Sequence, residues 1–512
     1  MCGICVIKVD QETSGNRHSL SHRGPDQHVD ALCSGWMWSF DRLAINGVEN
    51  GEQPFKNDRS IFFCNGEIYN HHSLQEAFKI PTTTQSDCEC IFRVLDQGVD
   101  IETLYDKIDG EFAFAFMRDT HMIVARDHFG VRPLFVATDR MGKIVGFASE
   151  AKSLTHVQNC HIEQFPPGEA WKIDTETNVV DKYDFKTRSP KVLSTADTSV
   201  IRALLINAVQ KRLMSEKPVG YFLSGGLDSS IIAAIAANLS TTPITTYSIG
   251  MKGSDSADIV AARKVAAHLN TNHVEVEFEA IEAIQALPDI VRQLESYDCT
   301  TIRASVPMFL LCREIARRGQ HQVMLSGEGA DELFGGYLYL HGSPSSEAFQ
   351  SETERLLACI HQYDGLRADR CTAAHGLELR VPFLDKQFTD YVIGVNASEK
   401  IPNSVNMEKM ILRDAFKAFL PSEIIYRQKN GMSDAVGTQW IDYIKAHVST
   451  LILKPLVNIS RNAPLTNEEH WYRQLYIQWY KNVISHQSIW RPKWTIETDP
   501  SARNLPCFVA NQ

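Results

Sequence analysis

Short runs of apolar and aromatic residues dominate the first third of the chain. Such runs, bounded by polar or turn residues, are typical of β-strands, whose side chains alternate between two faces. Seven runs fit this pattern, at residues 3–9, 36–45, 61–68, 111–117, 122–125, 134–137 and 144–148. Helical spacing occurs only at 72–79 and 87–97. We therefore predict layered sheets with few helices for this region.

After residue 198 the pattern alternates between helices and strands. Helical periods occur at 200–214, 228–239 and 257–269, and strand-like runs at 219–223, 244–249 and 273–278. This order predicts an α/β domain with a parallel sheet covered by helices. Two more helices, at 281–295 and 306–317, precede a strand at 322–325 and a loop at 326–336. Beyond that loop the chain is mainly helical.

A change of composition separates the two regions. Pro166-Pro167-Gly168 and the polar stretch 186–198 interrupt both patterns and indicate a domain boundary. We predict one domain at 2–185 and a second at 199–485, and assign no role to the tail at 486–512. The 512 residues far exceed the ~150 of a typical domain, which agrees with two domains.

Composition excludes several classes of protein. Hydrophobic residues make up 44% and charged residues 22% of the chain, as in folded soluble proteins. The net charge of -11 and the lack of a Lys/Arg cluster argue against nucleic acid as a partner. The most apolar stretch, 231–239, is too short to span a membrane, and residues 1–10 do not resemble a signal peptide. We predict a cytoplasmic protein in which most of the scattered cysteines are buried, reduced thiols.

A glycine turn joins the predicted strand at 219–223 to the following helix. Its sequence, Ser-Gly-Gly-Leu-Asp-Ser-Ser at 224–230, lets backbone N–H groups approach an anion at the start of a helix. The lysine of a Walker A loop and the G-x-G-x-x-G of a dinucleotide loop are both missing. Taken alone, Gly-Gly in this context is most often an ordinary turn.

A second loop, at 326–332, also follows a strand and carries Asp331. Ligands of open sheets bind at the carboxyl edge of the strands, so Asp228 and Asp331 are predicted to hold Mg2+ against a polyphosphate there. Leu223 and Ile249 would end neighbouring strands at the same edge and could enclose an adenine. Both fit equally well as plain core residues.

At this point the motif S-G-G-x-D-S resembles the signature of the PP-loop ATP pyrophosphatases, which cleave ATP between the α and β phosphates and adenylate an acyl oxygen. The resemblance implies ATP as a substrate, together with Mg2+. The ATP site would comprise Leu223, Ser224, Gly225, Gly226, Asp228, Ser229, Ser230, Ile249, Ser326 and Gly327.

The second residue of the chain is a cysteine, Cys2. Removal of Met1 would give it both a thiol and a free α-amine, which can act as a general base at neutral pH. Asn65-Gly66-Glu67, at the end of a predicted strand, would supply donors for an oxyanion and an acid. Taken alone, Cys2 also fits a small buried residue, and Asn-Gly is the commonest hairpin turn.

Further segments, at 22–26, 41–45, 65–70, 86–89 and 126–134, together resemble the class II glutamine amidotransferase domain. That family implies an amino-terminal-nucleophile hydrolase with an αββα sandwich. Cys2 would attack the side-chain amide of glutamine, and Asn65 and Gly66 would form the oxyanion hole. Arg42 would clamp the substrate carboxylate, because a planar guanidinium suits bidentate binding. The remaining glutamine-binding residues would be Leu43, Ala44, Ile45, Asn46, Glu67 and Asp87, the last two against the substrate ammonium.

The order of the two domains, with motifs at 376–385 and 427–431, resembles the family of glutamine-hydrolysing asparagine synthetases over about residues 2–440. The resemblance implies that MgATP activates aspartate as β-aspartyl-AMP and that ammonia from the first site converts it to asparagine. Lys429 would neutralise charge on the phosphate, and Glu328 would assist formation or aminolysis of the intermediate. Arg303 is a further candidate for an aspartate carboxylate. The sequence leaves open whether two copies of the chain form a homodimer.

Two alternatives remain at this stage. A related amide ligase or a β-lactam synthetase would act on another carboxylate, but those lactam enzymes usually lose the cysteine that Cys2-Gly3 retains here. A non-catalytic regulator would keep the fold as a binding module, although it has no need for this full set of reactive side chains. The span from Cys2 to His22 is short against the family, which predicts a trimmed first helix.

Overall fold

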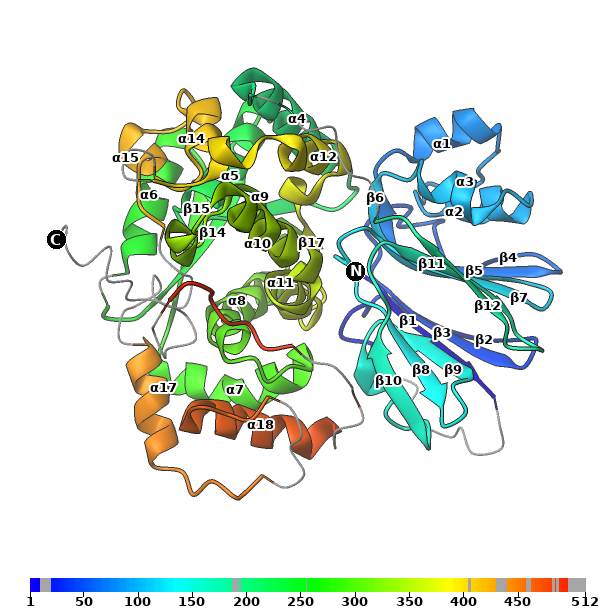
Figure 1. Ribbon diagram of the computed structural model, residues 1–512. Helices are drawn as coiled ribbons and strands as arrows, with labels where there is room; N and C mark the ends of the chain where they lie inside the picture. The colour runs from blue at the N-terminus through cyan, green and yellow to red at the C-terminus, as the bar shows by residue number, and fades with distance from the viewer. Residues whose placement is uncertain are drawn as a thin grey trace.

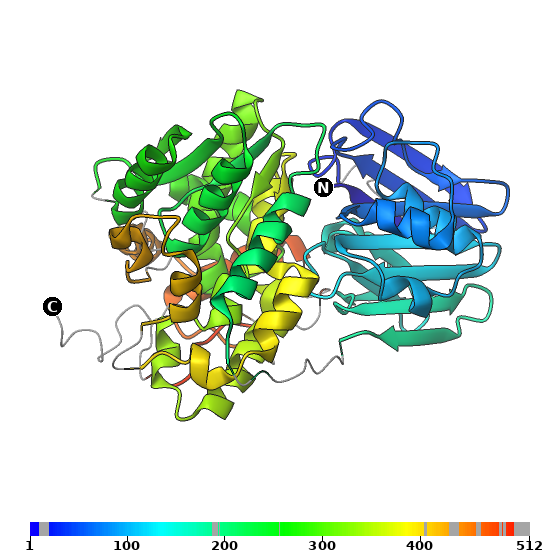
Figure 2. The ribbon, with the colours of Figure 1, turned by 90° about the horizontal axis from the view of Figure 1, so that it is seen from above.

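The computed structural model describes residues 1–9, 20–186, 193, 195–254, 256–403, 407–429, 440–456, 462–480, 484 and 488–495. The chain forms two parts that lie side by side, and its N-terminus lies at their junction in both views (Figures 1 and 2). Of the predicted tail, 486–487 and 496–512 lie outside the described residues, as does the span after the first strand, 10–19.

The first part contains two stacked antiparallel sheets. One has the order β10-β8-β9-β1-β3-β2 and the other β12-β11-β7-β6-β5-β4. The strands of the first are β1 (Gly3–Lys8), β2 (Gln27–Cys33), β3 (Trp36–Arg42), β8 (Phe135–Asp139), β9 (Ile144–Ala148) and β10 (Cys160–Gln164). The second comprises β4 (Phe55–Lys56), β5 (Ser60–Ile68), β6 (Gly110–Arg118), β7 (His121–Arg126), β11 (Glu169–Asp174) and β12 (Val180–Asp184). The predicted layered sheets are therefore confirmed.

Helices α1 (His71–Phe78), α2 (Glu89–Asp96) and α3 (Ile101–Tyr105) cover the outer face of the second sheet (Figure 1). Strand β5 shows why its sequence is apolar throughout. Ile61 and Phe63 pack between the sheets, whereas Phe62 and Cys64 pack against the helices. Because both faces are covered, the strand reads as a continuous hydrophobic run.

Five strands in the described residues of the first part escaped prediction: β2, β4, β10, β11 and β12. Four of them, β2, β4, β10 and β12, are edge strands. The burial pattern of β2 is half-exposed along most of its length, so its sequence carries no hydrophobic run. Pro166-Pro167-Gly168 forms a turn between β10 and β11 within the first sheet sandwich, and does not begin the linker.

The second part contains a parallel sheet with the order β15-β14-β13-β16-β17. Its strands are β13 (Val219–Phe222), β14 (Thr245–Met251), β15 (Asn272–Phe278), β16 (Val323–Leu325) and β17 (Glu378–Arg380). The helices that alternate with them are α4 (Thr198–Lys211), α5 (Leu227–Leu239), α6 (Ala257–Leu269), α7 (Ala280–Leu294) and α8 (Cys299–Arg318). This confirms the predicted α/β fold. Helix α8 begins before the predicted residue 306 because the Asp298 side chain accepts the Thr301 N–H and caps it.

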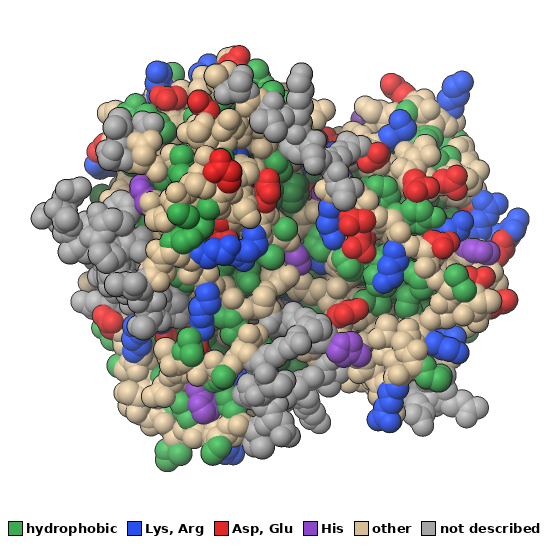
Figure 3. Space-filling view, viewed as in Figure 1, with side chains coloured by type: hydrophobic (Ala, Val, Ile, Leu, Met, Phe, Trp, Pro, Cys, Tyr) green, Lys and Arg blue, Asp and Glu red, His purple; other side chains and the backbone are tan. Residues whose placement is uncertain are grey.

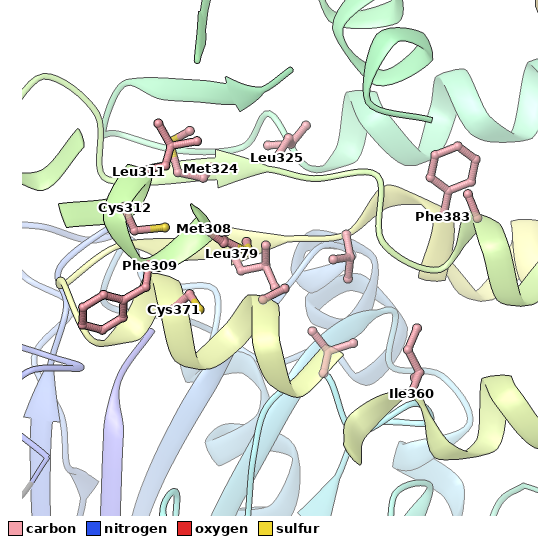
Figure 4. Packing of buried hydrophobic residues seen from close by; sticks show 14 of the residues in the cluster. Met308, Phe309, Leu311, Cys312, Met324, Leu325, Ile360, Cys371, Leu379 and Phe383 are labelled. Carbon is pink, nitrogen blue, oxygen red and sulfur yellow. The ribbon is translucent and has the colours of Figure 1, made fainter. Parts of the chain in front are cut away.

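The remaining described elements are helical. They are α9 (Ala330–Phe334), η2 (Leu338–Gly342), α10 (Ser346–Cys359), η3 (Ile360–Gln362), α11 (Asp364–Ala373), η4 (Pro382–Leu384), α12 (Lys386–Gly394), α13 (Ala397–Lys400), α14 (Met410–Phe416), α15 (Ser422–Ile425), α17 (Trp440–Ser449) and α18 (Asn467–Tyr480). Figure 4 shows Met324 and Leu379 of adjacent strands close to Met308 and Cys312 of α8, which is how this helix closes one face of the sheet.

The strand order brings the two predicted phosphate loops to the same edge of the parallel sheet. The chain adds β14 and β15 on one side of β13, and then β16 and β17 on the other. The order thus reverses between β13 and β16, and the loops that follow these two strands open at the same edge. Such a switch point is where open α/β sheets bind ligands.

The surface carries both signs of charge. On the face shown in Figure 3, Lys and Arg side chains are interspersed with Asp and Glu. Among the residues described, no helix combines the length and apolarity that crossing a bilayer requires.

Candidate active sites

Cys2 lies immediately before β1, a central strand of the first sheet. Its backbone N–H donates to Asn65 Oδ1 at 2.8 Å, and its thiol donates to Leu43 O at 3.8 Å. Burial raises the pKa of the thiol, and the nearby N-terminal ammonium and Arg42 oppose this shift. Asn65 belongs to β5 of the other sheet, so the predicted nucleophile and its partner meet between the two layers.

Met1 is buried next to this site. Its ammonium donates to Glu378 Oε2 of β17 at 3.1 Å, which joins the start of the chain to the second domain. While Met1 is attached, the Cys2 nitrogen is an amide and cannot accept a proton. The α-amine of Cys2 can therefore act as a base only after Met1 has been removed.

Asn65 and Gly66 have the features of an oxyanion hole. Asn65 is fully buried, and within the described part of the chain its Nδ2 has no hydrogen-bond acceptor, although its Oδ1 is paired. A buried donor without a partner is costly, unless a ligand satisfies it. At Gly66 a Cβ atom would lie 2.5 Å from Glu111 O and 2.7 Å from Phe112 Cα of β6, so only glycine fits.

The predicted glutamine pocket is assembled around the same point. Arg42 ends β3 and donates to Gly47 O at 2.5 Å, which folds the predicted wall of Leu43, Ala44, Ile45 and Asn46 into a turn. Asn46 Nδ2 donates to Glu67 Oε2 at 2.7 Å. Asp87 accepts the Ile68 N–H at 2.6 Å, just beyond Glu67. Burial raises the pKa of both Glu67 and Asp87. A cation bound beside them would stabilise their charged forms.

The first phosphate loop has the expected backbone geometry. Gly225 has a φ of 71°, and a Cβ there would lie 2.4 Å from Ala262 N of α6. Gly226 caps α5, and its N–H donates to Ser224 Oγ, which contacts Ser229 Oγ at 3.0 Å. Ser230 is buried within α5, and Leu223 and Ile249 belong to the apolar core. The loop is thus an ordered turn at a helix start.

The second loop packs directly on the first. A Cβ at Gly327 would lie 2.9 Å from Asp228 Cβ, so glycine permits the close approach, and Ser326 precedes it after β16. Lys409 Nζ lies 2.5 Å from both Asp228 Oδ2 and Asp331 Oδ1. The two predicted metal ligands are therefore brought together at the switch point.

Lys429 completes this cluster, because its Nζ lies 2.5 Å from Asp331 Oδ2. Burial alone would raise the pKa of Asp331, but Lys409 and Lys429 lower it well below its usual value. The formal charges of the two lysines and the two aspartates cancel. Such a balanced cluster can exchange partners when a charged ligand enters.

The donor set fits Mg2+. Asp228 Oδ1 is buried and has no hydrogen-bond partner among the described residues. Mg2+ is held by one or two carboxylates together with substrate phosphates and water. No group of three or more His, Cys, Asp or Glu side chains that could hold a metal ion occurs in the described ranges.

Glu328 lies on the same loop but has a different partner. Arg367 Nη2 donates to both of its carboxylate oxygens, at 2.8 and 2.9 Å, and also pairs with Asp364. Tyr337 Oη donates to Asp364 Oδ2 at 2.5 Å and holds that side chain. Burial raises the pKa of Glu328, and Arg367 opposes this shift. Glu328 is therefore fixed beside the loop rather than free to rotate.

Arg303, the further candidate for an aspartate carboxylate, is engaged elsewhere. Its guanidinium donates to both oxygens of Glu468 on α18, at 2.8 and 2.7 Å, with both side chains buried. The pair ties α8 to α18.

Lys409 and Arg367 are site residues that sequence reasoning missed. Lys409 follows Glu408 just before α14, in a segment with no glycine loop or motif. The only indication is structural: a Cβ at Gly336 would lie 1.9 Å from Asp331 Oδ1 and 2.0 Å from Lys409 Cε. Gly336 therefore leaves the space through which the lysine reaches the carboxylates.

We expect Gly336→Ala to lower the rate of the ATP-dependent reaction predicted at these loops by roughly 10²-fold, because a displacement of about 1 Å at a reacting site can cost that much. The thermal midpoint of unfolding should change little, since the end of a lysine side chain moves easily. Steady-state assays and a melting curve measure both. A normal rate, or a loss explained by unfolding, would contradict the proposed place of Lys409.

Two family models match the chain. The model described as Asparagine synthase matches residues 200–357 and 342–503, and the Glutamine amidotransferase domain matches residues 1–183. A protein named asparagine synthetase [glutamine-hydrolyzing] from Gallus gallus is 38% identical, over 99% of this chain and 98% of the relative. Its namesakes from Asparagus officinalis and Homo sapiens are each 37% identical, over 98% and 99% of this chain and 92% and 98% of their own. The chain therefore belongs to the family of glutamine-hydrolysing asparagine synthetases.

Proposed function

We propose that this chain makes asparagine from aspartate in two linked reactions, one at each site. In the first, glutamine is hydrolysed to glutamate and ammonia. In the second, ATP converts the β-carboxylate of aspartate into β-aspartyl-AMP with release of pyrophosphate, and ammonia then displaces AMP to give asparagine.

The first reaction uses Cys2 as nucleophile. After removal of Met1 the α-amine of Cys2 takes the thiol proton, and the sulfur attacks the amide carbon of glutamine. The proton passes to the leaving ammonia, and water hydrolyses the thioester to glutamate. Asn65 Nδ2 and the Gly66 N–H stabilise the negative oxygen of the tetrahedral intermediate. Support for this role comes from the buried Nδ2, which has no acceptor within the described residues.

Glutamine is held by its two backbone groups. Arg42 binds the carboxylate, Glu67 and Asp87 bind the ammonium, and residues 43–46 line the wall. The burial of both acids supports this assignment, since a carboxylate in a dry pocket pairs strongly with a cation.

The second reaction takes place between the two loops. The phosphates bind against the loops at 224–230 and 326–327, where the start of α5 favours an anion, and Leu223 and Ile249 contact the adenine. Asp228 and Asp331 would hold Mg2+, which withdraws negative charge from the phosphates when bound. Lys429 and Lys409 provide positive charge beside the reacting phosphorus, and Glu328, fixed by Arg367, assists formation or aminolysis of β-aspartyl-AMP.

One observation carries this proposal: two loops of a PP-loop sheet bring Asp228 and Asp331 onto one shared lysine, in the same chain that begins with Cys2 beside Asn65. The test is incubation with amide-15N glutamine, aspartate and MgATP, with every product identified. We expect labelled asparagine, glutamate, AMP and pyrophosphate. Omission of aspartate should reduce AMP to background. Unchanged AMP formation would favour a ligase that acts on another carboxylate.

A cytoplasmic location and a homodimer remain part of this proposal. Gel filtration with light scattering measures the assembly, and a second copy per particle is the expected result.

A further inference from the structure

Strand β17 of the second domain carries an arginine that reaches the glutamine pocket of the first. Arg380 is fully buried, and its Nη2 lies 3.2 Å from Glu67 Oε1. Glu67 directly follows Gly66 of the oxyanion hole and also accepts from Asn46. A residue far outside the predicted pocket thus contacts the carboxylate assigned to the substrate ammonium.

We propose that Arg380 is a positioning residue for glutamine, which holds Glu67 charged and in place to bind the α-ammonium group of the substrate. This inference rests on the role of Glu67 in the proposed function.

Glu67 needs such a partner because of its surroundings. Burial raises the pKa of its carboxyl, and Asp87 and Glu378 raise it further, whereas Arg380 and Arg132 lower it. Without the Arg380 charge, Glu67 would hold a proton more readily. A protonated carboxyl attracts an ammonium group much less strongly than a carboxylate does.

The structure fixes the Arg380 side chain on several sides. Nη1 donates to Arg212 O at 2.9 Å and to Met214 O at 2.5 Å, and Nε donates to Glu378 Oε1 at 2.8 Å. Its own carbonyl accepts the Ser326 N–H at 3.0 Å, at the start of the second phosphate loop. The guanidinium therefore presents a fixed charge to Glu67.

The turn that Arg380 holds also touches the other end of the glutamine pocket. Glu216, two residues after Met214, accepts the Gly47 N–H at 2.7 Å. Gly47 O in turn accepts from Arg42, the predicted clamp for the glutamine carboxylate. The second domain thus supports both groups that are predicted to bind the backbone of glutamine.

The test compares two substrates: glutamine, and glutaramate, which is glutamine without its α-amino group. Arg380→Gln removes the charge and keeps a polar side chain with one amide donor. We expect kcat/KM for glutamine to fall roughly 10- to 100-fold, mainly through KM, as for the loss of a charge-assisted contact. Hydrolysis of glutaramate should change little. Because both substrates are measured on one sample, the ratio does not depend on the fraction of protein that folds.

Two further variants separate positioning from general damage. Arg380→Lys keeps the charge and should retain most of the preference for glutamine. Arg370→Met removes another buried arginine of the same interface, which pairs with Glu150 and Glu295, and should leave the preference unchanged. An unchanged ratio in Arg380→Gln, or an equal fall in Arg370→Met, would overturn the proposal. Wild-type protein that hydrolyses neither substrate would instead refute the proposed function.

Discussion

Cys2→Ala is expected to abolish asparagine synthesis from glutamine and to leave synthesis from ammonium salts intact. The variant removes the sulfur that attacks the amide, and loss of a nucleophile typically costs roughly 10⁴-fold or more. The second site requires only the amine, and its loops lie in another domain. Initial rates with glutamine and with ammonium chloride, at saturating aspartate and MgATP, measure the two activities separately.

Cys5→Ala is a matched control, because Cys5 is a thiol three residues after Cys2, within strand β1. It should retain both activities. An equal loss of glutamine-dependent and ammonia-dependent synthesis in Cys2→Ala would mean that the two reactions do not occur at separate sites.

Asp228→Asn should lower the formation of AMP and pyrophosphate by several kcal/mol of barrier, on the order of 10²- to 10⁴-fold in rate. The amide keeps the shape of the side chain but loses the charge that faces Lys409 and the predicted magnesium ion. Pyrophosphate release over a range of Mg2+ concentrations measures the effect.

Hydrolysis of glutamine by the same Asp228→Asn sample serves as the internal control and should continue, since Asp228 lies in the other domain. A normal rate of pyrophosphate release at saturating Mg2+ would remove Asp228 from the metal site.

Much of the fold was predictable because its signals are local. Strands covered on both faces, such as β5, read as hydrophobic runs, and the loop at 224–230 carries its glycines between a strand and a helix. The edge strands β2 and β12 carry no such signal, because one side of each meets solvent or loops. Edge positions therefore limit what a pattern can predict.

The site residues also fall into two groups, those with a local sequence signal and those without one. Cys2 and Asn65 each precede a glycine, and Asp228 and Asp331 lie in glycine-containing loops that follow strands, where local sequence indicates a close approach to a ligand. Lys409 lies 181 residues from the carboxylate it contacts. Arg380 meets Glu67 only because two domains dock. Such pairs depend on tertiary structure, and no spacing within one segment encodes them.

The buried position of Met1 also sets an order of events during biosynthesis. Met1 is 1% exposed, and its ammonium is paired with Glu378 in β17, the edge strand of the parallel sheet. An aminopeptidase has no access to it in the finished molecule. Excision must therefore precede the packing of β17 against the start of the chain. A delay in that cleavage would produce enzyme that still works with free ammonia but never acquires the use of glutamine.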